Sequence, residues 1–261
     1  MPQKERPQAL KNAPQNVSMS TKPEQDLLET ALKSGKMELQ GQFLPGSNYT
    51  FLTTIHYKGR QYPAVYKPAR GEQPLWDFPP ATLAKREVAA FLVSRALGWD
   101  LVPLTILRNG PFGPGSLQQF IPYDPAYHYF TFTAEDKARL RPVALFDLLV
   151  NNADRKGSHL LIEKNTHKLW LIDHGLCFHQ EDKLRTVIWD FAGESIPTEL
   201  LADLERFLSA LRADLSLRRQ LRRYLSPGET EALARRAADL LASSVFPHPP
   251  AHRRAFPYPP V

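Results

Sequence analysis

The sequence of 261 residues is nearly free of cysteine and has no long apolar segment. Its single cysteine, Cys177, excludes a disulfide framework, and no spacing of cysteine and histidine resembles a zinc site. No run approaches the roughly 18 consecutive apolar residues that a membrane-spanning helix needs. Residues 1–15 carry charge but lack the apolar core of a secretory signal. We therefore expect a cytoplasmic protein without a transmembrane segment.

Glycine loops that bind phosphate are also scarce. No Walker A sequence occurs, which excludes a P-loop NTPase. The one glycine-rich stretch, residues 109–115, contains Pro111 and Pro114, and proline lacks the backbone N–H that a phosphate cradle requires. This stretch therefore predicts the tight turn of a β-hairpin.

Positive charge and proline gather at the two ends of the chain. The net charge is +6, of which residues 1–25 and 246–261 hold +2 each, so the body carries only +2. A nearly neutral body disfavours a dedicated nucleic-acid-binding protein. Ten of the 24 prolines also lie in these two ranges, and we expect both to be flexible extensions.

The pattern between these ends changes once, near Pro122. Residues 26–122 read mainly as strands and residues 123–245 mainly as helices. The first part predicts strands at residues 37–43, 49–59, 62–67, 101–107 and 117–121 and a helix at residues 81–97. The second part predicts helices at residues 135–151, 198–211, 214–225 and 229–244 and a short strand pair at residues 159–162 and 169–172. This order predicts an α+β fold of two lobes with a cleft between them.

Two aspartates stand where paired strands would bring them together. Asp154 follows a long predicted helix, and Asp173 ends the second strand of the short pair. Such carboxylates can hold Mg²⁺ and accept a proton from a hydroxyl group, which are two tasks of phosphoryl transfer. Alone, each is better explained as a helix cap or a turn residue. Together, they favour the functional interpretation.

A lysine and a glutamate complete the candidate site. Lys67 closes an apolar strand, so its ammonium would point into the cleft, and Glu87 in the following helix could pair with it. The alternative is a structural ion pair, which a buried lysine generally needs. The turn Gly46-Ser47-Asn48, about 20 residues before the lysine, could offer backbone N–H groups to phosphate, although it is a weak motif.

The motifs Asp-Arg-x-Gly and Ile-Asp-x-Gly, with the strand lysine and the helix glutamate before them, resemble the protein-kinase-like superfamily. Within it, the sequence is most similar to the phosphatidylinositol 3-/4-kinase-like branch, which includes type II phosphatidylinositol 4-kinases and HipA-type kinases. It looks like a group of bacterial proteins that carry YKPxRGExPLWDFPxxTLxxREVAA and VNNADRKGxHLL. The resemblance covers residues 43–191 and implies a bilobal kinase fold that binds ATP and Mg²⁺ or Mn²⁺ in its cleft.

The resemblance also implies a role for each candidate residue. Asp154 corresponds to the catalytic base, Asp173 to the magnesium ligand, and Lys67, supported by Glu87, to the lysine that holds phosphate. Related kinases usually place an asparagine for the second metal five residues after the base, where this sequence has His159. A neutral imidazole can also bind a metal, although it is softer than Mg²⁺ prefers.

Adenine and acceptor sites follow from the same resemblance. The strand end with Gln119, Phe120 and Ile121 corresponds to the hinge, whose backbone groups would hold adenine. Residues 176–197 correspond to the activation and substrate segment. Basic residues such as Lys183 are few there and are offset by acidic ones, which disfavours a polyphosphoinositide acceptor.

We therefore expect an ATP- and divalent-metal-dependent phosphotransferase acting on a hydroxyl of a protein, a small polyol or glycan, or a lipid headgroup. Two alternatives stay open. A nucleotidyl transferase on the same fold would bind ATP in the opposite sense and release pyrophosphate, whereas a pseudokinase, suggested only by His159, would bind nucleotide without turnover. The arginines within residues 218–223 form a basic helical face that is solvated by default, with peripheral contact to anionic lipid as the alternative.

Overall fold

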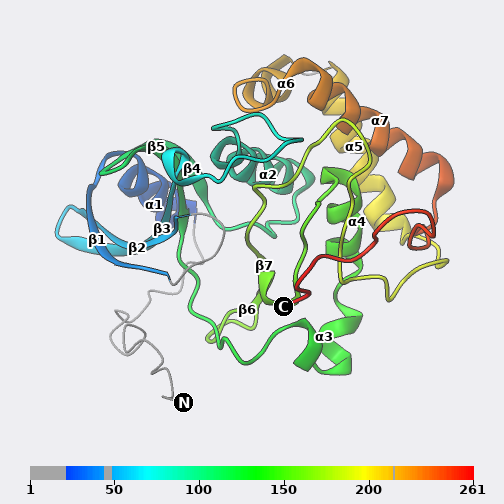
Figure 1. The fold of residues 1–261 in the computed structure, drawn as a ribbon, viewed down its shortest axis with the longest axis horizontal. Helices are drawn as coiled ribbons and strands as arrows, with labels where there is room; N and C mark the ends of the chain where they lie inside the picture. Colours follow the sequence, from blue (N-terminus) through cyan, green and yellow to red (C-terminus); the bar gives the residue numbers. More distant parts are fainter. Residues whose placement is uncertain (1–21, 44–48, 214) are drawn as a thin grey trace.

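The computed structural model describes residues 22–43, 49–213 and 215–261. An antiparallel sheet lies on one side of the molecule, a group of helices lies on the other, and helix α2 lies between them (Figure 1). The fold is therefore of the expected α+β, bilobal kind. The predicted phosphate-binding turn of Gly46, Ser47 and Asn48 falls outside the described residues, as do residues 1–21.

The sheet has five strands in the order β1-β2-β3-β5-β4. They are β1 (Lys36–Gln42), β2 (Phe51–Tyr57), β3 (Arg60–Pro68), β4 (Thr105–Gly110) and β5 (Gly113–Gln119). All neighbouring strands run antiparallel. Gly110 at the end of β4 pairs with Gly113 at the start of β5, so the hairpin turn predicted for the glycine-rich stretch is confirmed.

One helix of the sheet lobe escaped the sequence analysis. Helix α1 (Lys22–Ser34) packs Leu28 and Leu32 against Phe51 and other apolar side chains of the sheet. The helix begins inside residues 1–25, which we expected to be a flexible extension. With few apolar residues on its buried face, α1 gives only a weak helical periodicity in the sequence. The helix is stabilised by burial against strands that lie later in the chain.

Helix α2 (Leu83–Leu97) joins the two parts of the molecule. At its start, the Glu72 carboxylate accepts the backbone N–H groups of Leu83 and Ala84, at 3.2 and 2.9 Å. At its end, Gly98 has φ +75°, a left-handed conformation that glycine adopts without steric cost. Ten of its 15 residues are buried. Most of its buried apolar side chains share one core with the helices that follow.

The helical part contains α3 (Ala134–Ala138), α4 (Arg141–Val150), α5 (Thr198–Ala213), α6 (Leu215–Leu221) and α7 (Pro227–Ser243), with the antiparallel strand pair β6 (Leu160–Ile162) and β7 (Leu169–Leu171) between α4 and α5. The predicted helix at residues 135–151 is divided into α3 and α4. The division falls near Pro142, which lies in the first turn of α4. A proline lacks the backbone N–H that would continue a preceding helix, but it is well tolerated in a first turn. None of the helices in the described part of the chain is long and apolar enough to cross a membrane.

Residues 246–261, drawn in red in Figure 1, pack along the helical part instead of extending from it as a flexible tail. The Thr186 N–H donates to the carbonyl of Ala255 at 3.1 Å, and the Gly157 N–H donates to the carbonyl of Pro260 at 2.8 Å. Proline removes hydrogen-bond donors from this segment but leaves its carbonyl oxygens free to accept. The composition therefore argues against a helix or a strand, but not against docking.

Candidate active site

The candidate site lies in a cavity of about 510 Å³ between the sheet and the helical part. The sheet lobe and α2 contribute Lys67 and Glu87, whereas the helical part contributes Asp154, His159 and Asp173. Of these, the lysine and the last aspartate are 106 positions apart in the sequence and are joined by a hydrogen bond. The structure thus brings all five of these predicted side chains to one cavity.

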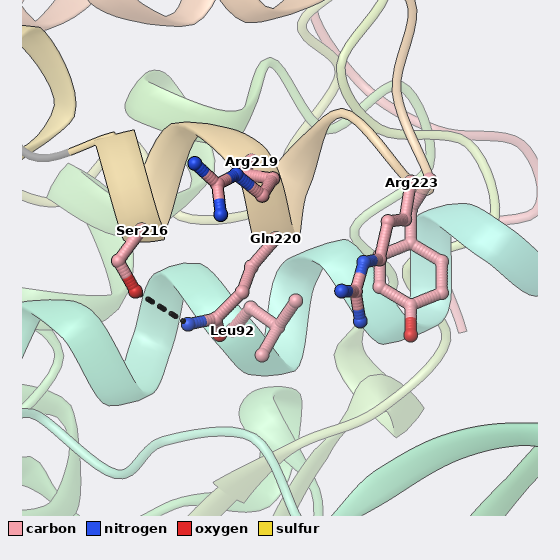
Figure 2. A pocket seen from close by; sticks show the side chains of 6 residues that line it. Leu92, Ser216, Arg219, Gln220 and Arg223 are labelled. Carbon is pink, nitrogen blue, oxygen red and sulfur yellow. Dashed lines mark hydrogen bonds between the residues drawn. The ribbon is translucent and has the colours of Figure 1, made fainter.

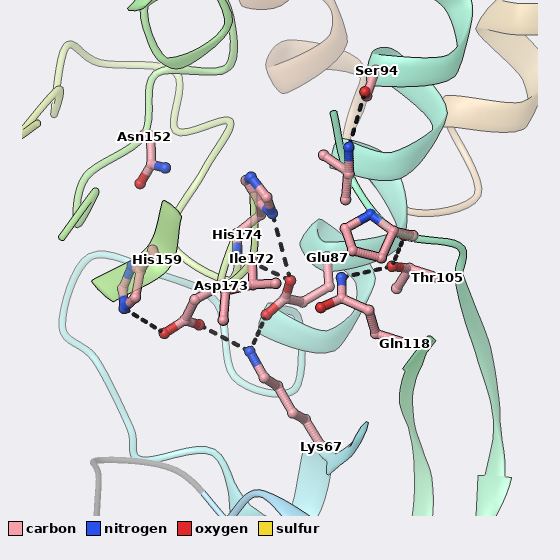
Figure 3. A network of polar contacts seen from close by, with 12 residues as sticks. Lys67, Glu87, Ser94, Thr105, Gln118, Asn152, His159, Ile172, Asp173 and His174 are labelled. Carbon is pink, nitrogen blue, oxygen red and sulfur yellow. Dashed lines mark hydrogen bonds and ion pairs between the residues drawn. The ribbon is translucent and has the colours of Figure 1, made fainter. Parts of the chain in front are cut away.

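Lys67 lies between two carboxylates (Figure 3). Its Nζ donates to Oε1 of Glu87 at 2.6 Å and to Oδ1 of Asp173 at 3.0 Å. The Glu87 side chain is 4% exposed and the Asp173 side chain is 48% exposed, so the network runs from the core to the open cleft. Glu87 therefore holds Lys67 at the buried end of the network, and Asp173 contacts it at the end that faces the cavity.

These contacts fix the charge of both partners. Burial alone would lower the pKa of Lys67, but Asp173 and Glu87 raise it above its ordinary value. Burial alone would raise the pKa of Asp173, but Lys67 and His159 hold it well below its ordinary value. An opposite charge at this distance favours the ionised form of each group. At neutral pH Lys67 therefore carries an ammonium and Asp173 a carboxylate.

The backbone beside Asp173 belongs to the same network. Asp173 follows β7 and has φ +62°, a left-handed conformation that is uncommon outside glycine. The next backbone N–H, that of His174, donates to Oε2 of Glu87 at 3.0 Å. Glu87 thus holds Lys67 with one oxygen and the turn at Asp173 with the other. Strained backbone of this kind persists where the surrounding contacts determine it, most often at functional sites.

Arg155, which the sequence analysis did not single out, supports this turn. Its fully buried guanidinium donates to both carboxylate oxygens of Asp147, at 3.0 and 3.1 Å, and to the carbonyl of Ile172 at 2.8 Å. It also contacts the ring of His174 at 2.8 Å. The sequence does hold a signal for this pair. Asp147 is the one charged residue in the apolar run VALFDLLV, and a buried carboxylate there needs a cation nearby.

Asp154 begins the loop that leads to β6. Its backbone N–H donates to Oδ1 of Asn152 at 3.0 Å, and its carboxylate lies 3.6 Å from Nζ of Lys156. Burial raises the pKa of Asp154 to about 6, an effect that Lys156 opposes only in part. Such a carboxylate is still ionised at neutral pH and is a stronger base than an ordinary aspartate. It can therefore accept a proton from a hydroxyl group in the cavity.

His159 contacts Asp173 from the other side. Burial lowers the pKa of His159 to about 4, so the ring is neutral at pH 7. The backbone N–H of Lys156 donates to Nδ1 at 3.4 Å, which places the ring proton on Nε2, 3.2 Å from Oδ2 of Asp173. In this tautomer the imidazole orients the aspartate. Its assignment as a metal ligand stays a prediction, and metal binding through Nε2 would require the other tautomer.

Part of the cavity wall is apolar, and we call this part the apolar slot. Val65 of β3 lines it from the sheet, and Leu161 and Ile172 line it from the helical part. Cofactor sites are typically lined by apolar side chains of this kind, with a few polar groups that fix orientation. The slot therefore has the character needed for a planar aromatic ring.

The predicted hinge borders this slot. The backbone N–H groups of Gln119 and Phe120 are already used within the protein, because they donate to the carbonyls of Leu104 and Pro63 at 2.8 and 3.1 Å. Ile121 is the next residue along the same edge and also lines the cavity. Among these three N–H groups, that of Ile121 has no partner among the described residues and is therefore available to a ring bound in the slot.

The donor set at the mouth of the cavity bears on metal binding. Among the described residues, no three His, Cys, Asp or Glu side chains converge as a group that could hold a metal ion. Asp154 and Asp173 nevertheless line the same cavity. Mg²⁺ is usually held by one or two carboxylates together with substrate phosphates and water. The residues present would thus fit a metal ion that phosphate oxygens and water complete.

No protein-family model matches the sequence, but several solved structures resemble the fold. A structure of the Golgi casein kinase with Mn and ADP bound gives a TM-score of 0.57 at 17% identity and covers 85% of this chain and 76% of that chain. A structure of hydra Fam20 with sugar gives 0.53 at 14% identity, over 87% and 90% of the two chains. The proinflammatory kinase CtkA of Helicobacter pylori gives 0.51 at 12% identity, over 82% and 94%. These likenesses show a bilobal protein-kinase-like fold.

One relative shares much more sequence. Protein Rv2133c of Mycobacterium tuberculosis (strain ATCC 25618 / H37Rv) is 38% identical over 257 residues, which cover 85% of this chain and 91% of that protein. Identity at this level extends over most of both chains. The chain therefore belongs to the same family as Protein Rv2133c.

Proposed function

We propose that this protein is a kinase that moves the γ-phosphate of ATP to a hydroxyl group in a divalent-metal-dependent reaction. One observation carries the proposal. Nζ of Lys67 lies within 3.0 Å of both Glu87 and Asp173, and Asp154 lines the same cavity beside an apolar slot. Phosphoryl transfer requires a cation for the phosphates, a carboxylate for the metal and a base for the acceptor. Membership of the phosphatidylinositol 3-/4-kinase-like branch is part of this proposal.

Each residue has one task in the proposed site. Ile121 donates its backbone N–H to the adenine ring in the slot, and Lys67, oriented by Glu87, binds the phosphates. Asp173 holds the metal, which neutralises charge on the phosphate oxygens when it is bound. The Mn and ADP in the Golgi casein kinase structure are consistent with this arrangement.

The chemical step uses Asp154. The oxygen of the acceptor hydroxyl forms a bond to the γ-phosphorus, while the bond from that phosphorus to the β–γ bridging oxygen breaks and ADP leaves. The hydroxyl proton passes to the carboxylate of Asp154. Because burial raises the pKa of this carboxyl to about 6, the group is mostly ionised at pH 7 and holds the proton better than an ordinary aspartate.

The acceptor in this proposal is a protein or small-molecule hydroxyl in preference to a polyphosphoinositide. Lys183, one of the few basic residues in the segment after Asp173, lies 3.6 Å from the carboxylate of Asp77 and 3.3 Å from that of Glu181. Its charge is therefore already balanced within the protein. A headgroup that carries several phosphates would need cations without such partners.

The test is the nucleotide product formed from ATP with Mg²⁺ or Mn²⁺ by the wild-type protein, Asp173→Ala and Asp154→Asn. We expect the wild type to form ADP. Asp154→Asn should lose turnover while retaining nucleotide affinity by calorimetry, and Asp173→Ala should also lose the metal-dependent part of nucleotide binding. AMP with pyrophosphate would instead establish a nucleotidyl transferase. Metal-dependent ATP binding without turnover, across candidate protein and polyol acceptors, would favour a pseudokinase.

A further inference from the structure

A second concave surface lies against α2. It is separate from the cavity that holds Lys67, Asp154 and Asp173, which we call the nucleotide cavity after its proposed ligand. Two adjoining cavities of about 460 and 540 Å³ share Arg223 and Tyr224 in their walls. We call this surface the α2–α6 groove, and it is lined by Lys85, Leu92, Arg219, Arg222, Arg223 and Tyr224. None of these six residues lines the nucleotide cavity. Figure 2 shows Arg219 on α6 and Arg223 in the chain that follows it, beside Leu92 of α2.

The cations of the groove have no anionic partners within the described chain. Neither Lys85 nor any of Arg219, Arg222 and Arg223 forms an ion pair or a side-chain hydrogen bond with another described residue. Other arginines do form such pairs, as Arg155 does with Asp147 at 3.0 Å. Arg219 and Arg223 line one of the two cavities, and Lys85, Arg222 and Arg223 line the other. The cations that share a cavity repel one another, because like charges near a low-dielectric wall are poorly screened.

The acidic residues of the groove do not offset this charge. Asp77 lies 3.6 Å from Nζ of Lys183, and Glu229 is paired with the buried guanidinium of Arg86. Both carboxylates therefore already have a cation of their own. Within the part of the chain that the structure describes, the four groove cations are thus left for another ligand.

The chemistry of the lining indicates the class of that ligand. Three of the four cations are guanidinium groups, which bind phosphate oxygens in a bidentate manner. Leu92 and Tyr224 add apolar surface beside them. The concave shape suits a compact anion better than it suits the flat surface of a membrane. We propose that the α2–α6 groove binds a soluble compound that carries two or more phosphate groups.

The groove is separate from the proposed catalytic chemistry, so the two proposals stand or fall independently. Lys85 and Glu87 are two positions apart on α2 and line different cavities. The three arginines are exposed, so their replacement leaves no hole in the core. A loss of ligand binding in their variants is therefore interpretable without a loss of folding.

The test measures the binding of inorganic tripolyphosphate by calorimetry in the absence of divalent metal. Arg219→Ala/Arg223→Ala should weaken binding by about tenfold or more, because the variant loses two guanidinium groups that can donate to the phosphate oxygens. The matched control is Arg139→Ala/Arg206→Ala, which removes the same charge from arginines outside the groove that are paired with Asp136 and Asp203. This control should bind as the wild type does.

A third variant separates the groove from the nucleotide cavity. Lys67→Met should bind tripolyphosphate with wild-type affinity if the groove is the site. The proposal is overturned if Lys67→Met abolishes binding while the groove variant retains it, or if the control pair weakens binding as much as the groove pair. Binding only to vesicles that contain phosphatidylserine, with none to tripolyphosphate, would overturn it as well and assign the groove to a membrane surface.

Discussion

Two cation-lined surfaces lie against helix α2, the cavity of Lys67 and the α2–α6 groove, and they differ in how their charges are balanced. In the nucleotide cavity, Lys67 has a carboxylate on either side, at 2.6 and 3.0 Å. In the α2–α6 groove, four cations lack an anionic partner among the described residues. The first arrangement is held in place before any ligand arrives. The second gains its balance only when a ligand supplies the anions. Cations thus serve two purposes in this fold. Those with carboxylate partners are held in a fixed position, and those without are left to bind an anionic ligand.

The largest effect should come from removing a fully paired, buried cation. Arg155→Met leaves the Asp147 carboxylate in the core without its guanidinium, and breaking such a pair typically costs about 3–5 kcal/mol. Urea unfolding followed by fluorescence measures this loss. The double variant Asp147→Asn/Arg155→Met should recover much of it, because no unpaired charge then stays buried. A single variant as stable as the wild type would contradict the proposed role of the pair.

The next effect concerns the partner of Lys67. Glu87→Gln keeps the shape of the side chain but removes its charge, so Lys67 loses the buried anchor and keeps only Asp173. A hydrogen bond between charged groups contributes about 1.5–3 kcal/mol, so we expect kcat/KM for ATP turnover to fall by about ten- to hundredfold. Glu205→Gln, an exposed carboxylate on α5, is the matched control and should not change turnover. Equal rates for Glu87→Gln and the wild type would show that the pair is structural only.

A smaller effect should appear in the pH profile. Burial raises the pKa of Asp154 from 3.8 to about 6, so the protonated fraction grows as the pH falls through this value. Only the ionised carboxylate accepts the acceptor proton, and kcat/KM should therefore decrease by about tenfold per pH unit below pH 6. An ordinary aspartate would keep its activity for about two more units. A profile that stays flat down to pH 5 would place the base elsewhere.

The smallest effect should come from the unpaired cations. Arg219 is exposed and has no partner within the described chain, so Arg219→Ala should change the free energy of unfolding by no more than about 0.5 kcal/mol. The measurement is the same urea titration as for Arg155→Met, which makes the two arginines a direct pair. A large destabilisation by Arg219→Ala would mean that the groove has an internal partner and would erase the contrast.

The sequence predicts the local elements of this fold well. Hydrophobic alternation and the turn residues place four strands of the sheet within a few residues of their observed positions, and Gly98 marks the end of α2. The candidate site is predicted because Lys67, Asp154 and Asp173 each end or follow an apolar segment, where a charge is conspicuous. Their proximity follows from the strand pairing and not from any one segment.

The remaining features depend on contacts that the local pattern does not contain. Helix α1 is stabilised by strands that come later in the chain. Residues 246–261 dock through backbone carbonyl groups, which every residue has, so the amino-acid composition does not reveal the docking. In the sequence, Arg155 cannot be distinguished from an exposed loop residue. Its burial follows from the fold, in which Asp147 of α4 lies beside it in the core. Long-range burial, rather than local propensity, decides each of these cases.

Helix α2 has one further consequence, for motion. Most of its buried apolar side chains belong to the core of the helical part, whereas the sheet packs on α1 in a core of its own. Helix α2 also contacts β4 and β5, so it packs on both parts of the molecule, and Glu87 stands between the two parts. The 2.6 Å contact between Lys67 and Glu87 ties β3 to this helix, so any hinge opening that separates β3 from α2 would have to break it, on the microsecond-to-millisecond timescale of such motions.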